Sequence, residues 1–250
     1  MNFTVIIPSR YQSSRLPGKP LIDLAGCSMI ERVWIQATKS GANKIIIATD
    51  DRRIEDACSG FNANVCLTSS LHQSGTDRLA EVIEKMCIPE DEIIINVQGD
   101  EPLIPVENIV QVATLLEKDP DAFMATLSTP ITSIDEFKDP NVVKVVADNI
   151  NNALYFSRSA IPFDRDNTQK SELRITSVYQ RHIGLYGYRA GFLKTFSNWE
   201  PSDLEQLEKL EQLRVLSHGY KIKIEQAKIA PPAGIDTHED VARVEKLLAL

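Results

Sequence analysis

Positively charged side chains gather just after the first predicted strand, residues 5–7. Arg10 follows that strand, and a polar loop that contains Arg15 and Lys19 comes before the next helical pattern. Ligands of open α/β sheets bind beyond the carboxyl ends of the strands, and a loop with backbone N–H groups, Arg and Lys suits a triphosphate. A solvated basic loop would contain the same residues, so the loop alone does not decide.

A carboxylate follows the fourth predicted strand, residues 93–97. Asp100 lies within Gln98-Gly99-Asp100-Glu101-Pro102, and parallel strands would place it at the same sheet edge as the basic loop. Mg²⁺ takes few carboxylates and keeps the rest of its octahedron for water and phosphate oxygens, so one Asp beside a triphosphate is chemically sensible. An Asp that closes a Gly-containing turn before a proline is the alternative.

Glu211 is a candidate for binding a polar ligand. A helix is predicted near residues 204–216, and Leu204, Leu207, Glu211 and Val215 would share one of its faces. A buried acid needs a partner, which could be a sugar hydroxyl or a neighbouring Arg.

Three other polar residues each have an ordinary structural alternative. Ser74 could be a helix cap, His182 a core or turn histidine, and Asp236 an acid that complements the dipole of the last helix. The motifs of two common nucleotide-binding folds are missing, since no G-x-G-x-x-G follows the first strand and no G-x-x-x-x-G-K-[ST] occurs. Dehydrogenases and P-loop kinases are therefore disfavoured.

Several motifs together resemble one family. They are Arg10 with residues 14–20 (SRLPGKP), residues 71–78 (LHQSGTDR), residues 98–102 (QGDEP), residues 155–158 (YFSR), residues 181–188 (RHIGLYGY), residues 210–214 (LEQLR) and residues 234–237 (GIDT). Across essentially the whole chain they resemble the 3-deoxy-manno-octulosonate (Kdo) cytidylyltransferases, also called CMP-Kdo synthetases.

The resemblance implies a role for each candidate residue. The implied catalytic residues are Arg10, Arg15, Lys19 and Asp100; the nucleotide-binding residues are Arg10, Ser14, Arg15, Lys19, Ser74 and Gln98. The implied sugar-binding residues are Gln98, Arg158, His182, Tyr186, Glu211 and Gln212, and the metal ligands are Asp100 and Asp236, which would hold one or two Mg²⁺ ions.

The elements that must position these residues alternate between strand and helix patterns. Predicted strands at residues 5–7, 44–48, 63–67 and 93–97 are separated by apolar stripes at helical spacing, which indicates a doubly wound, mostly parallel sheet. Strand-like runs at 142–146, 153–156 and 183–188 predict an α+β extension, and the polar stretch 164–177 predicts a loop. The resemblance implies a sheet of the nucleotide-diphospho-sugar transferase type, which is GT-A-like. We expect one domain, with a nucleotide-binding half at about 1–130 and a sugar-binding and dimerisation half at about 131–250.

Composition limits the classes of partner. A formal net charge of −8 disfavours nucleic-acid binding. The longest apolar runs are strand-sized, and neither a membrane span nor a secretion signal is expected, so a cytoplasmic location is the default. The four cysteines are mutually distant and form no C-x-x-C pair, which disfavours disulfide and zinc scaffolds.

The expected reaction is implied by the resemblance. CTP and Kdo would give CMP-Kdo and diphosphate for lipopolysaccharide biosynthesis, in a homodimer. Two alternatives stay open at this point: a cytidylyltransferase for 8-amino-Kdo or a sialic acid, and a catalytically silent nucleotide-binding regulator.

Overall fold

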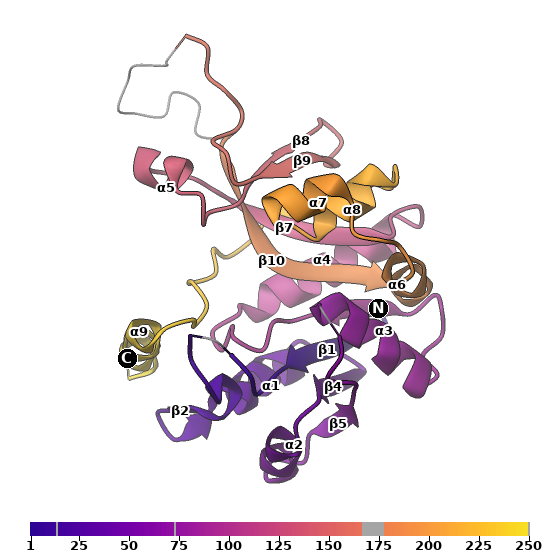
Figure 1. The fold of residues 1–250 in the computed structure, drawn as a ribbon, viewed down its shortest axis with the longest axis vertical. Coiled ribbons are helices and arrows are strands. Elements are labelled where there is room, and N and C mark those ends of the chain that lie inside the picture. The colour runs from indigo at the N-terminus through magenta and orange to yellow at the C-terminus, as the bar shows by residue number, and fades with distance from the viewer. Residues whose placement is uncertain (14, 73, 167–177, 250) are drawn as a thin grey trace.

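The protein is built on one mixed β-sheet with helices on both faces, as Figure 1 shows. The computed structural model describes residues 1–13, 15–72, 74–166 and 178–249. The strands of the main sheet are β1 (Phe3–Ser9), β4 (Lys44–Thr49), β5 (Asn64–Leu67), β6 (Ile93–Asn96), β7 (Met124–Pro130), β8 (Lys144–Ala147), β9 (Ala153–Ser157), β10 (Gln180–Arg189) and β11 (Ile222–Gln226). A small hairpin consists of β2 (Asp23–Leu24) and β3 (Cys27–Ser28).

The helices cover the sheet from both sides. They are the 3₁₀ helix η1 (Lys19–Leu21), then α1 (Met29–Lys39), α2 (Arg52–Ser59), α3 (Gly75–Lys85), α4 (Val106–Lys118), α5 (Ile134–Lys138), α6 (Ala190–Ser197), α7 (Asp203–Glu208), α8 (Gln212–Ser217) and α9 (His238–Leu248). Alternation along β1 divides the core. Ile6 packs in a cluster with residues of α3, α6 and α8, whereas Val5 and Ile7 pack in another with residues of α1, α2 and α4.

The strand order locates the functional edge. The order is β11-β7-β10-β6-β1-β4-β5, and β1 pairs in parallel with both β4 and β6. The chain runs outward from β1 through β4 to β5 and then returns to β6 on the other side of β1. Ligands of such sheets bind where the order reverses, beyond the carboxyl ends of the strands. The doubly wound, mostly parallel fold is confirmed. Its strand order predicts a ligand site at the carboxyl ends of β1 and β6.

Several observed elements differ from the sequence prediction. Strands β7 and β11 were not predicted. The prediction of one continuous helix near residues 204–216 was wrong, because Lys209 has a positive φ of 54° and separates α7 from α8. Leu207 is 81% exposed, so Glu211 does not share a buried face with it. The predicted loop at 164–177 lies outside the described residues from 167 onward.

The two halves of the chain share the sheet. β10, from the second half, is antiparallel to β6 on one side and to β7 on the other. The assignment of one half to the nucleotide and the other to the sugar stays a prediction.

Close packing of β10 against α4 predicts a glycine requirement at position 187. A Cβ atom added there would lie 2.7 Å from a Val112 methyl carbon and 2.9 Å from a Leu116 methyl carbon. We expect Gly187→Ala to lower the free energy of unfolding by about 1–3 kcal/mol through overpacking. Gly184→Ala, in the same strand with open space around its Cβ position, is the matched control. Urea denaturation of both variants would test this, and an equal effect in the two would contradict it.

Candidate functional site

A polar cleft of about 340 Å³ opens at the carboxyl ends of β1 and β6. Its lining residues are Pro8, Ser9, Arg10, Gln12, Ser13, Arg15, Lys19, Pro20, Gln98, Gly99 and Asp100. The basic loop and the acidic turn, which are far apart in the sequence, therefore face one space. Ser14 lies outside the described residues, so its predicted role is not addressed by the geometry.

Lys19 lies at the centre of an ionic cluster. Its Nζ is 2.7 Å from Oδ2 of Asp100 and 3.0 Å from Oδ1 of Asp236. Arg15 adds a third contact, with its Nη2 3.0 Å from Oδ2 of Asp236. The Lys19 side chain is 11% exposed, whereas the two carboxylates are 38% and 49% exposed. The two acids predicted as metal ligands thus both contact Lys19, although 136 residues separate them in the sequence.

Local backbone geometry brings these charges together. Gly18 has a φ of 71° and begins η1, which carries Lys19. A Cβ on Gly99 would lie 2.8 Å from the Pro8 carbonyl oxygen, so only glycine lets the acidic turn lie this close to the end of β1. The Ile235 N–H donates to the Asp100 carbonyl over 3.0 Å, which fixes the segment before α9 against the same turn.

The donor set of the cluster fits Mg²⁺. Asp100 and Asp236 offer hard carboxylate oxygens that remain partly open to solvent. No group of three or more His, Cys, Asp or Glu side chains with metal-binding geometry occurs among the described residues. A cation held by two carboxylates would need further oxygens from water and phosphate, which is how Mg²⁺ is usually bound beside a nucleotide.

Arg10 connects the cleft to the start of α3. Its Nη2 donates to the Ser74 carbonyl over 3.1 Å. Burial and the nearby charge of Arg78 lower the pKa of Arg10. The Ser74 hydroxyl accepts from the Asp77 N–H over 3.1 Å, and Asp77 returns the contact in a capping box. The structural alternative for Ser74, a helix cap, is therefore present, and its nucleotide-binding role stays a prediction.

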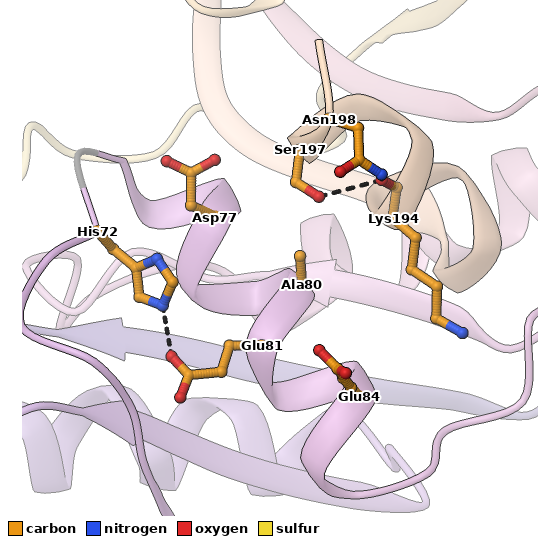
Figure 2. A pocket seen from close by; sticks show the side chains of 8 residues that line it. All are labelled: His72, Asp77, Ala80, Glu81, Glu84, Lys194, Ser197 and Asn198. Atoms are coloured by element: carbon orange, nitrogen blue, oxygen red, sulfur yellow. Dashed lines mark hydrogen bonds and ion pairs between the residues drawn. The ribbon is translucent and has the colours of Figure 1, made fainter.

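The loop that leads to Ser74 is held by Glu81. Its carboxylate accepts from the Ser69 N–H over 2.8 Å, contacts His72 Nε2 and pairs with Lys85 over 2.7 Å. Burial alone would raise the pKa of Glu81, but hydrogen bonds from Lys85, Ser69 and His72 lower it to about 2. Figure 2 shows the contact between His72 and Glu81 in a hollow of about 590 Å³ between α3 and α6. Asp77 also lines this hollow and lies on α3, as Glu81 does.

Two of the predicted sugar-binding residues carry unsatisfied polar atoms. Glu211 Oε2 accepts from the Thr76 hydroxyl over 2.9 Å, whereas Glu211 Oε1 is buried without a partner in the described structure. Gln212 is 4% exposed, and its Nε2 also has no partner there. Arg214, the neighbouring arginine that could have paired with Glu211, instead forms a double hydrogen bond with Glu205. A buried polar atom without a partner costs about 1–3 kcal/mol, so these atoms favour a bound polar ligand.

His182 and Tyr186 lie together on β10. Their ring centroids are 5.2 Å apart, and Phe156 packs edge-on against His182 at 5.0 Å. His182 Nε2 is 3.0 Å from the Thr126 hydroxyl oxygen. Burial lowers the pKa of His182 to about 3, so the imidazole is neutral near pH 7.

The neutral state of His182 predicts a pH dependence of stability. Histidine in the unfolded chain binds a proton near pH 6.5, while His182 in the folded chain does not until about pH 3. Below pH 6.5 the unfolded state therefore binds more protons, and the free energy of unfolding falls as the pH falls. We expect this slope to be steeper in the wild type than in His182→Gln by up to about 1.4 kcal/mol per pH unit between pH 6 and 5. Urea titrations at both pH values measure these slopes, and equal slopes would contradict a neutral His182.

The remaining two predicted residues lie differently. Gln98 lines the cleft beside Lys19 and Asp100. The Arg158 guanidinium donates to the carbonyl oxygens of Glu208, over 2.7 Å, and Pro140, over 2.9 Å. No hydrogen bond between Arg158 and the other predicted sugar residues is found among the described residues.

Thr76 was missed as a functional candidate. It belongs to the 71–78 motif, but a threonine after a helix cap carries no signal of its own, and its partner Glu211 is 135 residues away. Only the packing of α3 against the segment before α8 reveals the contact.

Comparisons with known proteins show the family to which the chain belongs. Residues 4–224 match the cytidylyltransferase family. The 3-deoxy-manno-octulosonate cytidylyltransferase of Vibrio parahaemolyticus is 57% identical over 249 residues, covering 100% of this chain and 99% of that protein, and its counterpart in Histophilus somni is 53% identical over 255 residues, covering 100% and 99%. A solved structure of CMP:2-keto-3-deoxy-manno-octonic acid synthetase complexed with CTP superposes with a TM-score of 0.90 at 40% identity, covering 100% of this chain and 99% of that one. The chain therefore belongs to the cytidylyltransferase family and, within it, to the 3-deoxy-manno-octulosonate cytidylyltransferases, as its motifs predicted.

Proposed function

We propose that the protein transfers a cytidylyl group from CTP to Kdo, giving CMP-Kdo and diphosphate for lipopolysaccharide biosynthesis. The observation that carries the proposal is the convergence of Lys19, Asp100 and Asp236 in a polar cleft at the switch point of the sheet. The names of the relatives support the choice of sugar, and the CTP in a 40% identical structure supports the choice of nucleotide.

The basic residues would bind the triphosphate. Arg10, Arg15 and Lys19 line the cleft, and each would place positive charge beside phosphate oxygens. Ser14, Ser74 and Gln98 complete the proposed nucleotide-binding set. Asp100 and Asp236 would hold Mg²⁺, which when bound neutralises phosphate charge and can lower the pKa of a coordinated hydroxyl.

The transfer itself would be one in-line displacement. The anomeric 2-hydroxyl oxygen of Kdo would form a bond to the α-phosphorus of CTP as the bond from that phosphorus to the β-phosphate oxygen breaks, and the hydroxyl proton would be lost to solvent. No covalent intermediate with the protein is needed. Positioning and charge neutralisation supply most of the rate enhancement in such reactions, and Lys19 would provide both to the departing diphosphate.

The sugar would lie toward β10 and α8. Gln98, Arg158, His182, Tyr186, Glu211 and Gln212 form the proposed sugar-binding set. Glu211 Oε1 would accept a hydrogen bond from a sugar hydroxyl, and Gln212 Nε2 would donate one to a sugar hydroxyl. His182, being neutral, would offer a hydrogen bond rather than a charge.

A homodimer and a cytoplasmic location are also part of the proposal. Within the described ranges, no helix has the length and apolar character needed to span a bilayer. Three exposed apolar side chains of the second half, Ile150, Leu154 and Phe163, would suit the subunit contact. Sedimentation equilibrium would test whether the protein is a homodimer.

Sugar competition is the experiment that tests the substrate assignment. Radiolabelled CTP would be incubated with the protein, Mg²⁺ and either Kdo, 8-amino-Kdo or a sialic acid, and the labelled CMP-sugars would be separated by chromatography. We expect the highest kcat/KM for Kdo. Equal or better turnover of another sugar would replace Kdo as the substrate, and CTP binding without turnover of any sugar would indicate a silent regulator.

A further inference from the structure

Three buried polar residues, Thr76, Tyr188 and Asn96, lie near the Glu211 carboxylate. Thr76, in the first turn of α3, is 3% exposed and donates to Glu211 Oε2 over 2.9 Å. Tyr188 of β10 is 3% exposed, and Thr76 and Asn96 lie close enough to its phenol to influence the pKa of that group. None of these three residues was assigned a role from the motifs.

The two oxygens of Glu211 have different surroundings. Oε2 is bound by Thr76, whereas Oε1 is buried and open. Within the described structure Glu211 has no ion-pair partner, because Arg214 is bound to Glu205. The hydrogen bond from Thr76 therefore orients this carboxylate, and the Ser74 hydroxyl also lies close enough to influence it.

Thr76 is itself held in place from two sides. The capping box of Ser74 and Asp77 fixes the first turn of α3, and Arg10 binds the Ser74 carbonyl. The position of the Thr76 hydroxyl thus depends on the capping box and on Arg10, which also lines the polar cleft.

We infer that Thr76 is a positioning residue for the acceptor sugar: its hydroxyl fixes the Glu211 carboxylate so that Oε1 stays free to accept a hydrogen bond from a sugar hydroxyl. Tyr188 lies beside Thr76, close enough for the two side chains to influence each other. The inference rests on the proposed sugar-binding role of Glu211.

Charges around Glu211 make the hydrogen bond matter for its ionisation. Burial raises the pKa of Glu211, while the hydroxyls of Ser74 and Thr76 and the charge of Arg214 lower it and the charge of Asp77 raises it. Tyr186 and Tyr188 face it from β10, and burial keeps both phenols protonated by raising their pKa. Loss of the Thr76 hydroxyl would remove a contact that favours the carboxylate, so a larger fraction of Glu211 would be protonated at a given acidic pH.

Steady-state kinetics of Thr76→Val test the inference, since valine keeps the volume and removes the hydroxyl. We expect kcat/KM for Kdo to fall about 10- to 100-fold, the loss of a hydrogen bond to a charged group, with KM for CTP changed less than about 2-fold. The acidic limb of the pH profile of kcat/KM for Kdo should move to higher pH. Thr76→Ser, which restores a hydroxyl, should return both quantities toward the wild type.

Thr4→Val is the matched control. Thr4 is a fully buried threonine whose hydroxyl donates to Glu92 Oε1 over 2.8 Å, at the start of β1 and thus at the opposite edge of the sheet. We expect it to lose stability as Thr76→Val does, with unchanged kinetics. Tyr188→Phe is a second variant in case Thr76→Val does not fold, and it should shift the same pH limb in the same direction by a smaller amount.

The outcomes are separable. A wild-type protein that does not turn over Kdo would overturn the proposed function. If the wild type is active but Glu211→Gln has normal kcat/KM for Kdo, the sugar-binding role of Glu211 and the inference both fail. If Glu211→Gln is impaired while Thr76→Val resembles Thr4→Val, with lower stability and a normal pH profile, Thr76 is only structural and the inference is overturned.

Discussion

Asp100→Ala is expected to reduce the rate of cytidylyl transfer by at least about 10³-fold while the fold stays intact, because in the proposed reaction this carboxylate would hold Mg²⁺ and would stabilise the transition state by several kcal/mol. The side chain is 38% exposed, and its partner Lys19 would keep Asp236 as a second contact. The free energy of unfolding should therefore change by less than about 1 kcal/mol. Single-turnover rates with CTP, Kdo and Mg²⁺, together with urea denaturation, measure both quantities.

Asp119→Ala provides the control for Asp100→Ala. Asp119 is 33% exposed and pairs with Lys223 over 3.1 Å, so it is a comparable ion-paired acid outside the cleft. Its loss should leave the transfer rate unchanged. A wild-type rate in Asp100→Ala, or an equal loss in both variants, would refute the assigned role of Asp100.

Lys19→Ala should lower kcat by about 10²- to 10³-fold, which corresponds to about 2.7–4 kcal/mol of lost charge stabilisation. The ammonium lies between two carboxylates, and its loss would leave Asp100 and Asp236 facing each other without the intervening charge. If Lys19 neutralises charge that develops on the diphosphate, kcat falls more than KM for CTP rises. Steady-state kinetics at saturating Mg²⁺ distinguish the two quantities.

The matched control for Lys19 is Lys223→Ala, since Lys223 is also a largely covered lysine in an ion pair. It should keep the wild-type kcat. A Lys19→Ala protein whose KM for CTP rises while kcat stays normal would show that Lys19 binds the ground state and the transition state equally.

The sequence predicted that the basic loop and the acidic turn lie at one edge of the sheet, because their placement depends on local rules. Apolar β-branched runs mark β1 and β6, and polar residues at their carboxyl ends meet at one edge of a parallel sheet. The closeness of Asp236 to Lys19 was implied only by family resemblance, since 217 residues separate the pair and a hydrogen bond from Ile235 to Asp100 brings them together.

The surroundings of Glu211 were harder to predict because their geometry depends on distant contacts. The sequence from Leu204 to Leu216 has a helical pattern, but the left-handed residue Lys209 divides it, and Leu210 and Leu213 are buried instead of Leu207. From the sequence, the partner of Glu211 could be a sugar hydroxyl or a neighbouring Arg, and the structure places the Thr76 hydroxyl 2.9 Å from its Oε2.

Strand β7 was missed for a related reason. Hydroxyl residues such as Thr126 interrupt its apolar pattern, yet Thr126 is fully buried because its hydroxyl contacts the carbonyl oxygens of Ile183 and Leu185 in β10. A pattern of side-chain polarity cannot anticipate a hydrogen bond that forms between strands more than fifty residues apart.

Release of diphosphate on mixing the wild-type protein with CTP, Mg²⁺ and Kdo tests the central claim most directly. The claim is that the positively charged side chains of the cleft bind the phosphates of CTP and that its carboxylates hold Mg²⁺. Together they would activate the α-phosphorus of CTP toward the sugar. We predict one diphosphate per CMP-Kdo formed, and no release when Kdo or Mg²⁺ is left out. Tight binding of CTP without diphosphate release in the complete mixture would contradict the account.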